Sequence, residues 1–366
     1  MFLDREARQN RASPRRFRLS PSTTGEGGKA ALYEDLIDLE QGVEELFTDP
    51  DPDHAREFFH GKNRGLVNKV TTVKQAVSVE VHDGDYLAVG GFGHVRIPTA
   101  ILYEIVRQKK RNLGMAGHTS IYDSDLLAST GCMDRCDISY VIGYEIRGLS
   151  ASARRAFEKK DIRKSDWSNC ALAWRFYAAS AGLSFIPSRN MLGTDTFKRS
   201  AAKTVTCPFT GKKFCALPAL YPDVGMVHVH RADIYGNCQI DGILVSDPYL
   251  ARASKRVIVS TEKLIPHEEI RANPKETIIP YWCVDAVVEA PYGGHPGNMP
   301  GEYWFDEDFF RMYLDTVKTE EGTEGFYKDY VFGVRDFEEY LDKIGGVNRM
   351  RELRAIEKLI YTDNVC

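Results

Sequence analysis

One stretch of the sequence restricts the fold more than any other, because a strand pattern changes to a helix pattern across a glycine-rich loop. Residues 86–90 (YLAVG) are an apolar run that predicts a strand, and residues 99–106 (TAILYEIV) carry apolar side chains at helical spacing just after Pro98. The loop between them, residues 91–96 (GFGHVR), therefore follows a strand and precedes a helix amino terminus, where backbone amides favour negative charge. It matches neither the dinucleotide fingerprint nor a P-loop. An anion or oxyanion cradle and a plain tight turn both remain open.

Composition narrows the classes of partner. The 366 residues are 43% hydrophobic, and 48 Lys plus Arg against 52 Asp plus Glu give a formal net charge of -4. This balance lacks the positive surface that nucleic acid or an anionic membrane attracts, so we expect neither as a partner. No apolar run approaches the roughly 18 residues that span a bilayer, and no charged-then-apolar signal segment opens the chain. We therefore expect a cytoplasmic protein.

The chain divides into three zones. Residues 1–30 are basic and rich in Ser, Pro and Gly, and we expect a flexible segment because they offer too little apolar surface for a core. Residues 31–66 form an acidic extension, and within residues 31–57 apolar side chains recur at helical spacing, which predicts an amphipathic helix. We expect this helix to pack on the main body or on a neighbouring subunit. Over residues 67–366, apolar runs alternate with helical patterns, which predicts an α/β domain.

Neither the cysteines nor the histidines predict a metal site. The eight cysteines are scattered, and the one close pair, Cys132 and Cys136, has no second half of a zinc site nearby. We interpret the cysteines as buried, reduced thiols. His228 and His230 alternate along a predicted strand and so share one face, but without a third ligand they are interpreted as structural polar residues.

A longer motif surrounds the glycine loop. Residues 83–92 follow the pattern DGxxLAVGGF, and five further residues separate this pattern from Pro98. This motif resembles the first signature of the family I coenzyme A transferases. The common signature has Gly two residues before the Pro, whereas Arg96 stands here, a departure that resembles the α subunit of glutaconate CoA-transferase. Other stretches similar to that subunit are residues 143–145 (GYE), 154–155 (RR), 178–187 (AASAGLSFIP), 284–296 (VDAVVEAPYGGHP) and 336–341 (DFEEYL), so that the resemblance covers about residues 68–346.

The resemblance implies the CoA-transferase fold, an open, mostly parallel α/β sheet flanked by helices, with the first 66 residues as an N-terminal extension. It also implies two similar subunits in an α2β2 assembly, with the active site between them. In this family a glutamate of the β subunit, within Ser-Glu-Asn-Gly, attacks an acyl-CoA thioester and then carries CoA as a glutamyl thioester. This chain contains no Ser-Glu-Asn-Gly, so the nucleophile is expected in a separate β subunit. The expected substrates are a coenzyme A thioester and a free, dicarboxylic acid, and no permanently bound cofactor is expected.

Three segments after predicted strands supply the expected oxyanion or substrate contacts. They contain Gly90, Gly91, Phe92, Gly93 and Arg96; His118, Thr119 and Ser120; and Gly293, Gly294 and His295. Arg96 could hold a substrate carboxylate by two parallel hydrogen bonds, pin the helix start, or pair across a subunit boundary. The residues at 118–120 could bind a carboxylate or serve as turn residues. His295 lies in a mobile-looking loop that could close over substrate or simply be a surface loop.

Glu145 is the one catalytic candidate of this chain. It follows the apolar run at residues 138–143, which we interpret as a strand, and a proton-transfer role and a buried structural role are both open. Two other function classes also remain. Related two-subunit proteins that lack the β glutamate hydrolyse CoA thioesters or cleave cyclic ketone CoA substrates with an acid of the α chain, for which Glu145 or Glu289 would be the candidates. The third class is a non-catalytic ligand-binding protein on the same fold.

Overall fold

The structure is a computed structural model that describes residues 40–141, 143–144, 147–159 and 162–359. The flexible segment expected at residues 1–30 and the start of the acidic extension lie outside the described residues. Within the described ranges, no helix combines the length and the apolar character needed to cross a bilayer.

The strands are β1 (Tyr86–Val89), β2 (Leu113–Gly117), β3 (Met133–Ile138), β4 (Arg163–Asp166), β5 (Phe185–Ser188), β6 (Lys203–Thr206), β7 (Lys213–Pro218), β8 (Val224–Ala232), β9 (Cys238–Gln239), β10 (Arg256–Leu264), β11 (Thr277–Ile279) and β12 (Ala286–Glu289). The α-helices are α2 (Pro52–Gly61), α3 (Val73–Glu80), α4 (Thr99–Arg107), α5 (Tyr122–Ser129), α6 (Ala151–Glu158), α7 (Asn169–Ser180), α8 (Asp195–Lys198), α9 (Asp247–Ala253), α10 (His267–Ala272), α11 (Glu307–Thr316), α12 (Glu320–Tyr327), α13 (Phe337–Lys343) and α14 (Gly346–Glu357).

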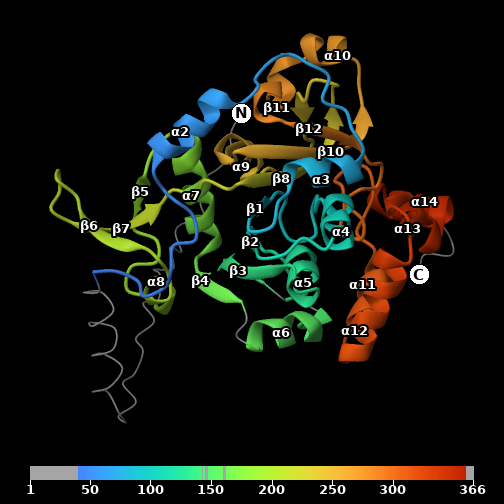
Figure 1. Ribbon diagram of the computed structural model, residues 1–366, viewed down its shortest axis with the longest axis horizontal. Helices are drawn as coiled ribbons and strands as arrows, with labels where there is room; N and C mark the ends of the chain where they lie inside the picture. Colours follow the sequence, from blue (N-terminus) through green and yellow to red (C-terminus); the bar gives the residue numbers. More distant parts are fainter. Residues whose placement is uncertain (1–39, 142, 145–146, 160–161, 360–366) are drawn as a thin grey trace, which may run out of the picture.

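A nine-stranded, mostly parallel sheet forms the centre of the molecule. Its parallel strands run in the order β12-β10-β8-β1-β2-β3-β4, and β9 and β11 extend it through antiparallel pairs beyond β8. Helices cover both faces (Figure 1). The open α/β sheet that the resemblance implied is confirmed.

Alternation along the strands divides the core into two layers. Leu87 and Val89 of β1 pack with α3, α4, α5 and the helices from α11 to α13 on one face of the sheet. Tyr86 and Ala88 pack with α7 and α9 on the other face. Successive side chains of a strand point to opposite faces, and a sheet buried on both faces is therefore apolar throughout, as the run at residues 86–89 is.

The strand order reverses beside β1. From β1 the chain passes through α4 to the neighbouring β2, whereas β8 pairs with the other side of β1 and leads away through α9 to β10. In open α/β sheets, ligands bind outside the carboxyl ends of the strands at such a reversal. The glycine loop follows β1 directly and lies at this position.

The acidic extension follows a different path from the predicted one. Gly42 N donates to Ala202 O (2.8 Å) and Thr204 N donates to Glu40 O (2.7 Å), so this segment lines the edge of the small antiparallel sheet β5-β7-β6. Residues 41–51 contain no helix, and the prediction of a helix over residues 31–57 is wrong for this part. The helix begins only at Pro52, because Asp51 accepts a hydrogen bond from Asp53 N and proline suits a first helical turn.

Candidate functional site

The three segments singled out in the sequence lie together at the carboxyl edge of the sheet. Gly93 N donates to His118 O (3.3 Å), which joins the glycine loop to the loop after β2. Arg96 N donates to Asn298 O (2.9 Å), and Asn298 N donates to His94 O (2.8 Å), which joins the glycine loop to the loop after β12. The carboxyl ends of parallel strands share one edge, so loops far apart in the sequence meet there.

The glycine loop uses its backbone amides for its own conformation. Gly90 N donates to Met226 O (2.8 Å), and Gly91 N donates to Asp247 Oδ1 (3.0 Å). Gly91 has a φ of +82°, and a β-carbon there would lie 2.2 Å from Val95 O, so only glycine fits without a shift of the backbone. Since these amides already have acceptors within the chain, the geometry favours the tight-turn interpretation over an oxyanion cradle.

Arg96 pairs within the chain and does not present its guanidinium to solvent. Its two terminal nitrogens each donate to one carboxylate oxygen of Asp247 at 2.8 Å, and one of them also donates to Ile243 O. Both side chains of the pair are fully buried. Burial raises the pKa of Asp247, but the charge and hydrogen bonds of Arg96 outweigh it and hold that pKa below its ordinary value. Arg96 thus fixes Asp247, which in turn holds the amide of Gly91.

The residues after β2 are also buried and bonded internally. His118 Nε2 and Ser246 Oγ lie 2.7 Å apart, and burial lowers the pKa of His118 to about 4, so the ring is neutral at pH 7. Thr119 N donates to Asn169 Oδ1 (3.2 Å), and Ser120 Oγ donates to a carboxylate of α5. These contacts are typical of a turn at a strand end. Within the described residues, His118 Nδ1 has no hydrogen-bond partner.

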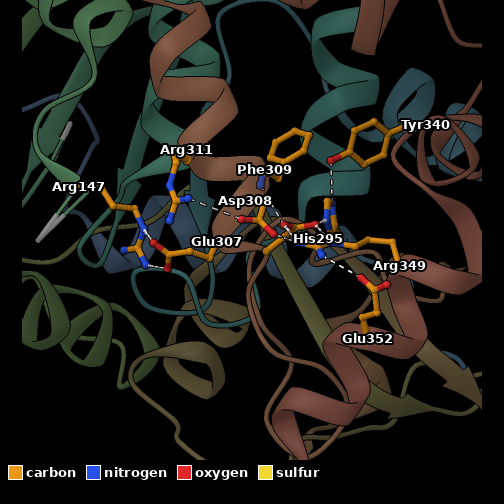
Figure 2. A network of polar contacts seen from close by, with 10 residues as sticks. Arg147, His295, Glu307, Asp308, Phe309, Arg311, Tyr340, Arg349 and Glu352 are labelled. Carbon is orange, nitrogen blue, oxygen red and sulfur yellow. Dashed lines mark hydrogen bonds and ion pairs between the residues drawn. The ribbon is translucent and has the colours of Figure 1, made fainter. Parts of the chain in front are cut away.

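His295 is buried, which corrects the expectation of a mobile loop that closes over substrate. Its Nδ1 pairs with Tyr340 Oη at 2.7 Å and its Nε2 with Asp306 Oδ2 at 3.1 Å. Arg349 donates to both carboxylate oxygens of Asp306, so the histidine joins the loop after β12 to α13 and α14 (Figure 2). With both ring nitrogens engaged, His295 stabilises the loop's position and has no free atom for a ligand.

The other predicted glycines allow close approaches of the backbone. A β-carbon on Gly293 would lie 2.7 Å from Ala290 O, and one on Gly294 would lie 3.0 Å from a tyrosine hydroxyl. Gly293 O accepts a hydrogen bond from Ala100 N (3.0 Å), which joins this loop to α4. Phe92, by contrast, is partly exposed at the surface of the glycine loop. It is therefore the member of the predicted set most accessible to another molecule.

Comparison with known proteins decides the family. Residues 70–290 match the coenzyme A transferase family. The chain belongs to this family. It is 34% identical over 312 residues to one subunit of glutaconate CoA-transferase of Acidaminococcus fermentans, the subunit designated A, and the match covers 81% of the chain and 97% of that subunit. An uncharacterised protein of Archaeoglobus fulgidus is 49% identical over 331 residues, which covers 90% of the chain and 74% of the relative.

Solved structures agree with the family assignment. The crystal structure of glutaconate coenzyme A-transferase from Acidaminococcus fermentans matches with a TM-score of 0.73 and 34% identity, over 78% of this chain and 95% of that one. The crystal structure of a variant of the decarboxylase AibA/AibB matches with a TM-score of 0.63 and 29% identity, over 71% and 98% of the two chains. This chain is therefore similar to proteins that carry more than one named activity.

The strand expected before Glu145 is displaced in the sequence. Glu145 itself lies outside the described residues. Of the run at residues 138–143, Ile138 ends β3, and the described residues 139–141 and 143 lie outside the strands. The polar residues of β3 made this strand hard to recognise from the sequence. Asp137, for example, is buried within β3 and accepts hydrogen bonds from Tyr86 Oη (2.5 Å) and Trp167 Nε1 (2.6 Å). A buried carboxylate is tolerated in a strand when neighbours supply such donors.

The second carboxylate candidate of the hydrolase alternative is placed differently. Glu289 ends β12 with an exposed side chain, whose Oε1 accepts a hydrogen bond from Leu264 N (3.2 Å). It thus lies at the carboxyl edge of the sheet, on the strand that precedes the loop containing His295.

The histidines of β8 form hydrogen bonds inside the family fold. His228 Nδ1 pairs with Ser260 Oγ (2.9 Å) and its Nε2 with Glu262 Oε1 (2.7 Å), and His230 Nε2 pairs with Pro300 O (2.8 Å). Over the described ranges, no group of three His, Cys, Asp or Glu side chains could hold a metal ion. One further expectation is wrong: Cys170 is exposed and is not one of the buried thiols.

Sequence reasoning missed three residues in or near the glycine loop. Asp247 was not singled out, although Ser246-Asp247-Pro248 carries the Ser, Asp and Pro typical of a helix start. His94 was overlooked although it lies within the glycine loop itself. Arg147 pairs with Glu307 of α11, 160 residues away, a contact that no local pattern could have indicated.

Proposed function

We propose that this chain is the α subunit of a heteromeric CoA-transferase, which moves CoA between an acyl-CoA and a free dicarboxylic acid. The family assignment supports transfer of CoA. The dicarboxylic substrate is supported by the names of two relatives, the glutaconate CoA-transferase subunit described above and a subunit of the 3-oxoadipate CoA-transferase of Pseudomonas knackmussii, the second 33% identical over 280 residues. That second match covers 75% of this chain and 98% of the relative.

The observation that carries the proposal is a carboxyl edge of the sheet whose loops are assembled in a chain without the Ser-Glu-Asn-Gly nucleophile motif. Three loops are hydrogen-bonded to one another at the strand reversal, yet their amides and Arg96 are engaged within the chain. Three cavities of about 210, 300 and 30 Å³ in the described residues are lined by other segments. The sequence contains no Ser-Glu-Asn-Gly. We infer that a second chain completes the pocket and supplies the glutamate.

Exposed apolar side chains beside the glycine loop support a partner at this position. Ile243 and Leu244 lie on the segment that leads into α9, Tyr249 lies in the first turn of that helix, and all three side chains are exposed. The same segment bonds to the loop, because Arg96 donates to Ile243 O. Clustered exposed apolar residues mark protein interaction sites more often than free surface.

The chemistry divides one difficult exchange into easier steps. The β glutamate oxygen forms a bond to the thioester carbon while the carbon–sulfur bond breaks, which gives a mixed anhydride and CoA thiolate. The thiolate then attacks the glutamyl carbonyl, releases the first acid, and forms the glutamyl-CoA thioester. The acceptor acid repeats these steps in reverse. In this proposal the rigid loops of the α chain position the acyl group and exclude water, which would otherwise hydrolyse the anhydride.

The test is a mass measurement on the assembled protein. The chain is co-expressed with the protein encoded beside it, the complex is incubated with a panel of acyl-CoA thioesters, and the intact masses of both chains are recorded. We expect a CoA-sized adduct on the partner chain that disappears when its candidate glutamate is replaced by alanine. Size measurement of the same complex tests the α2β2 assembly. Transfer activity without any adduct on the partner would contradict the proposed mechanism.

A second candidate is a subunit of a CoA-ester or ring-opening hydrolase. It is favoured by the cholesterol ring-cleaving hydrolase IpdA subunit of Rhodococcus jostii, which is 30% identical over 268 residues, 70% of this chain and 90% of that subunit. Hydrolysed product without an adduct, lost when Glu145 or Glu289 is replaced by glutamine, would establish this function. Binding of an acyl-CoA without turnover of any thioester would instead indicate a non-catalytic ligand-binding protein.

A further inference from the structure

His94 has an environment unlike that of the other buried histidines in the described residues. Its ring centroid lies 4.7 Å from that of Phe310, 5.4 Å from that of Phe305 and 6.1 Å from that of Tyr144. Only 8% of the residue is exposed, and neither ring nitrogen has a hydrogen-bond partner among the described residues. At least one ring nitrogen is hydrogen-bonded in each of the others, which are His118, His228, His230 and His295.

Tyr144, Phe305 and Phe310 form an aromatic cage around His94. This packing does not need a histidine, because a phenylalanine ring would fill the same space. Burial lowers the pKa of His94 to about 4. At neutral pH the imidazole therefore offers one N–H donor and one acceptor nitrogen. Buried polar groups in native proteins nearly always have a partner from the protein, from ordered water or from a ligand. This histidine thus carries a polar function that its described neighbours do not use.

A guanidinium lies in the same corner of the molecule. The guanidinium carbon of Arg147 is 4.9 Å from the ring centroid of Phe305, and both Arg147 and Glu307 lie near enough to His94 to influence its pKa. Nε and one terminal nitrogen of Arg147 donate to the two carboxylate oxygens of Glu307 (Figure 2). The Glu307 side chain is 40% exposed, whereas that of Arg147 is 11% exposed. Arg147 can therefore bind a carboxylate here, and Glu307 can move into water when another carboxylate takes its position.

We propose that His94 and Arg147 form a subsite for the far end of the acyl substrate. Arg147 binds the second carboxylate of the substrate in place of Glu307, and His94 donates a hydrogen bond to an oxygen of the same group. The planar guanidinium matches both oxygens of a carboxylate. Phe305 and the exposed Trp304, whose ring centroids lie 4.9 Å apart, supply apolar faces for the methylene chain. The inference rests on the proposed function and names the residues that select a dicarboxylic acid.

The test compares two acceptor acids of equal length in the assembled complex. Glutarate carries the second carboxylate and pentanoate does not, so the ratio of their kcat/KM values measures the subsite. His94→Phe fills the cage but removes both nitrogens, and Arg147→Met removes the charge. Each variant is expected to raise the KM for glutarate roughly tenfold to a hundredfold and to leave that for pentanoate within about threefold of its value in the unmodified complex.

Matched variants separate a substrate contact from a structural role. Arg335→Met removes an exposed ion pair with Glu339 outside this corner and is expected to change neither KM. His94→Gln keeps an N–H donor and is expected to restore part of the preference for glutarate. A merely structural role would lower the activity towards both acids alike. An unchanged ratio of the two kcat/KM values in His94→Phe and Arg147→Met would overturn the inference.

A separate binding measurement keeps the subsite testable if the proposed function fails. Absence of CoA transfer to either acid in the unmodified complex would count against the transferase itself. Calorimetric titration of the same complex with glutarate and pentanoate then reports on the subsite alone. Tighter binding of glutarate that disappears in Arg147→Met would support the subsite, and equal binding of the two acids would overturn it.

Discussion

Two arginine–carboxylate pairs near the glycine loop differ in their access to water. Arg96 and Asp247 pair through two hydrogen bonds of 2.8 Å with both side chains fully buried. Arg147 and Glu307 also pair through two hydrogen bonds, from Nε and one terminal nitrogen, but the carboxylate partner is exposed. An arginine–carboxylate pair thus stabilises the fold where both side chains are buried, whereas its carboxylate can be exchanged for another where that carboxylate reaches water. A buried charge that loses its partner cannot be hydrated, whereas an exposed one can.

Breaking the buried pair is expected to have the largest effect. Arg96→Met leaves the Asp247 carboxylate buried without its cation, and we expect a loss of about 3–5 kcal/mol in the free energy of unfolding. Urea denaturation of the full chain measures it. The double variant Arg96→Met/Asp247→Leu removes both charges and is expected to be less destabilised than Arg96→Met. A loss below about 1 kcal/mol in Arg96→Met would show that the pair is not what holds the loop.

Acid is expected to have an intermediate effect on stability, to which two buried histidines, His94 and His118, contribute. The pKa values of His94 and His118 are lowered to about 4, below the ordinary value of 6.5, because burial disfavours the charged ring. As the pH falls, these two histidines therefore bind protons at a higher pH in the unfolded chain than in the folded chain. The stabilisation is fully present above about pH 6.5 and is lost progressively down to about pH 4. When the pH falls from 7 to 5, each of these histidines is expected to lower the free energy of unfolding by about 2 kcal/mol.

The variant His94→Phe measures the contribution of His94 to this loss of stability in acid. Its free energy of unfolding, measured by urea denaturation at pH 7 and pH 5, is expected to fall by about 2 kcal/mol less than that of the unmodified chain. Replacement of the exposed His60 by phenylalanine serves as the control and is expected to leave the fall unchanged. Equal losses in the His94→Phe variant and the unmodified chain would contradict the burial argument.

Breaking the exposed pair is expected to have the smallest effect on stability. Arg147→Met is expected to lower the free energy of unfolding by only about 1 kcal/mol, because Glu307 regains water and the chief remaining loss is the contact of the cation with the Phe305 ring. The same denaturation measurement checks it. A loss as large as that of Arg96→Met would abolish the distinction between the two pairs and count against an exchangeable carboxylate at Arg147.

Local patterns predicted the central elements well and the extension poorly. The apolar run at residues 86–89 and the helical spacing at residues 99–106 gave β1 and α4, because both sides of each element meet the core that their periodicity implies. The spacing over residues 31–57 failed for the described part, since the backbone near Gly42 pairs instead with the edge of the small sheet. Propensity is a weak guide where tertiary pairing offers the backbone an alternative.

The candidate site shows the same division. The sequence placed Gly91, His118 and His295 in loops after strands, and those loops do meet at one edge of the sheet. It could not assign the roles of the side chains. His295 is buried against Tyr340 with its ring nitrogens engaged, and His94, although it lies in the glycine loop, is buried among aromatic rings that only the fold brings together.

By itself, the sequence determined the α/β layout, the glycine loop and the resemblance to the family, because these depend on periodicity and on residues close together along the chain. Only the tertiary structure decided that Arg96 pairs with Asp247, 151 residues away, and that Arg147 pairs with Glu307 at the surface. The reason is physical: the partner of a charge and its access to water depend on which strands and helices the fold brings together. These two quantities separate a structural arginine from one available to a substrate.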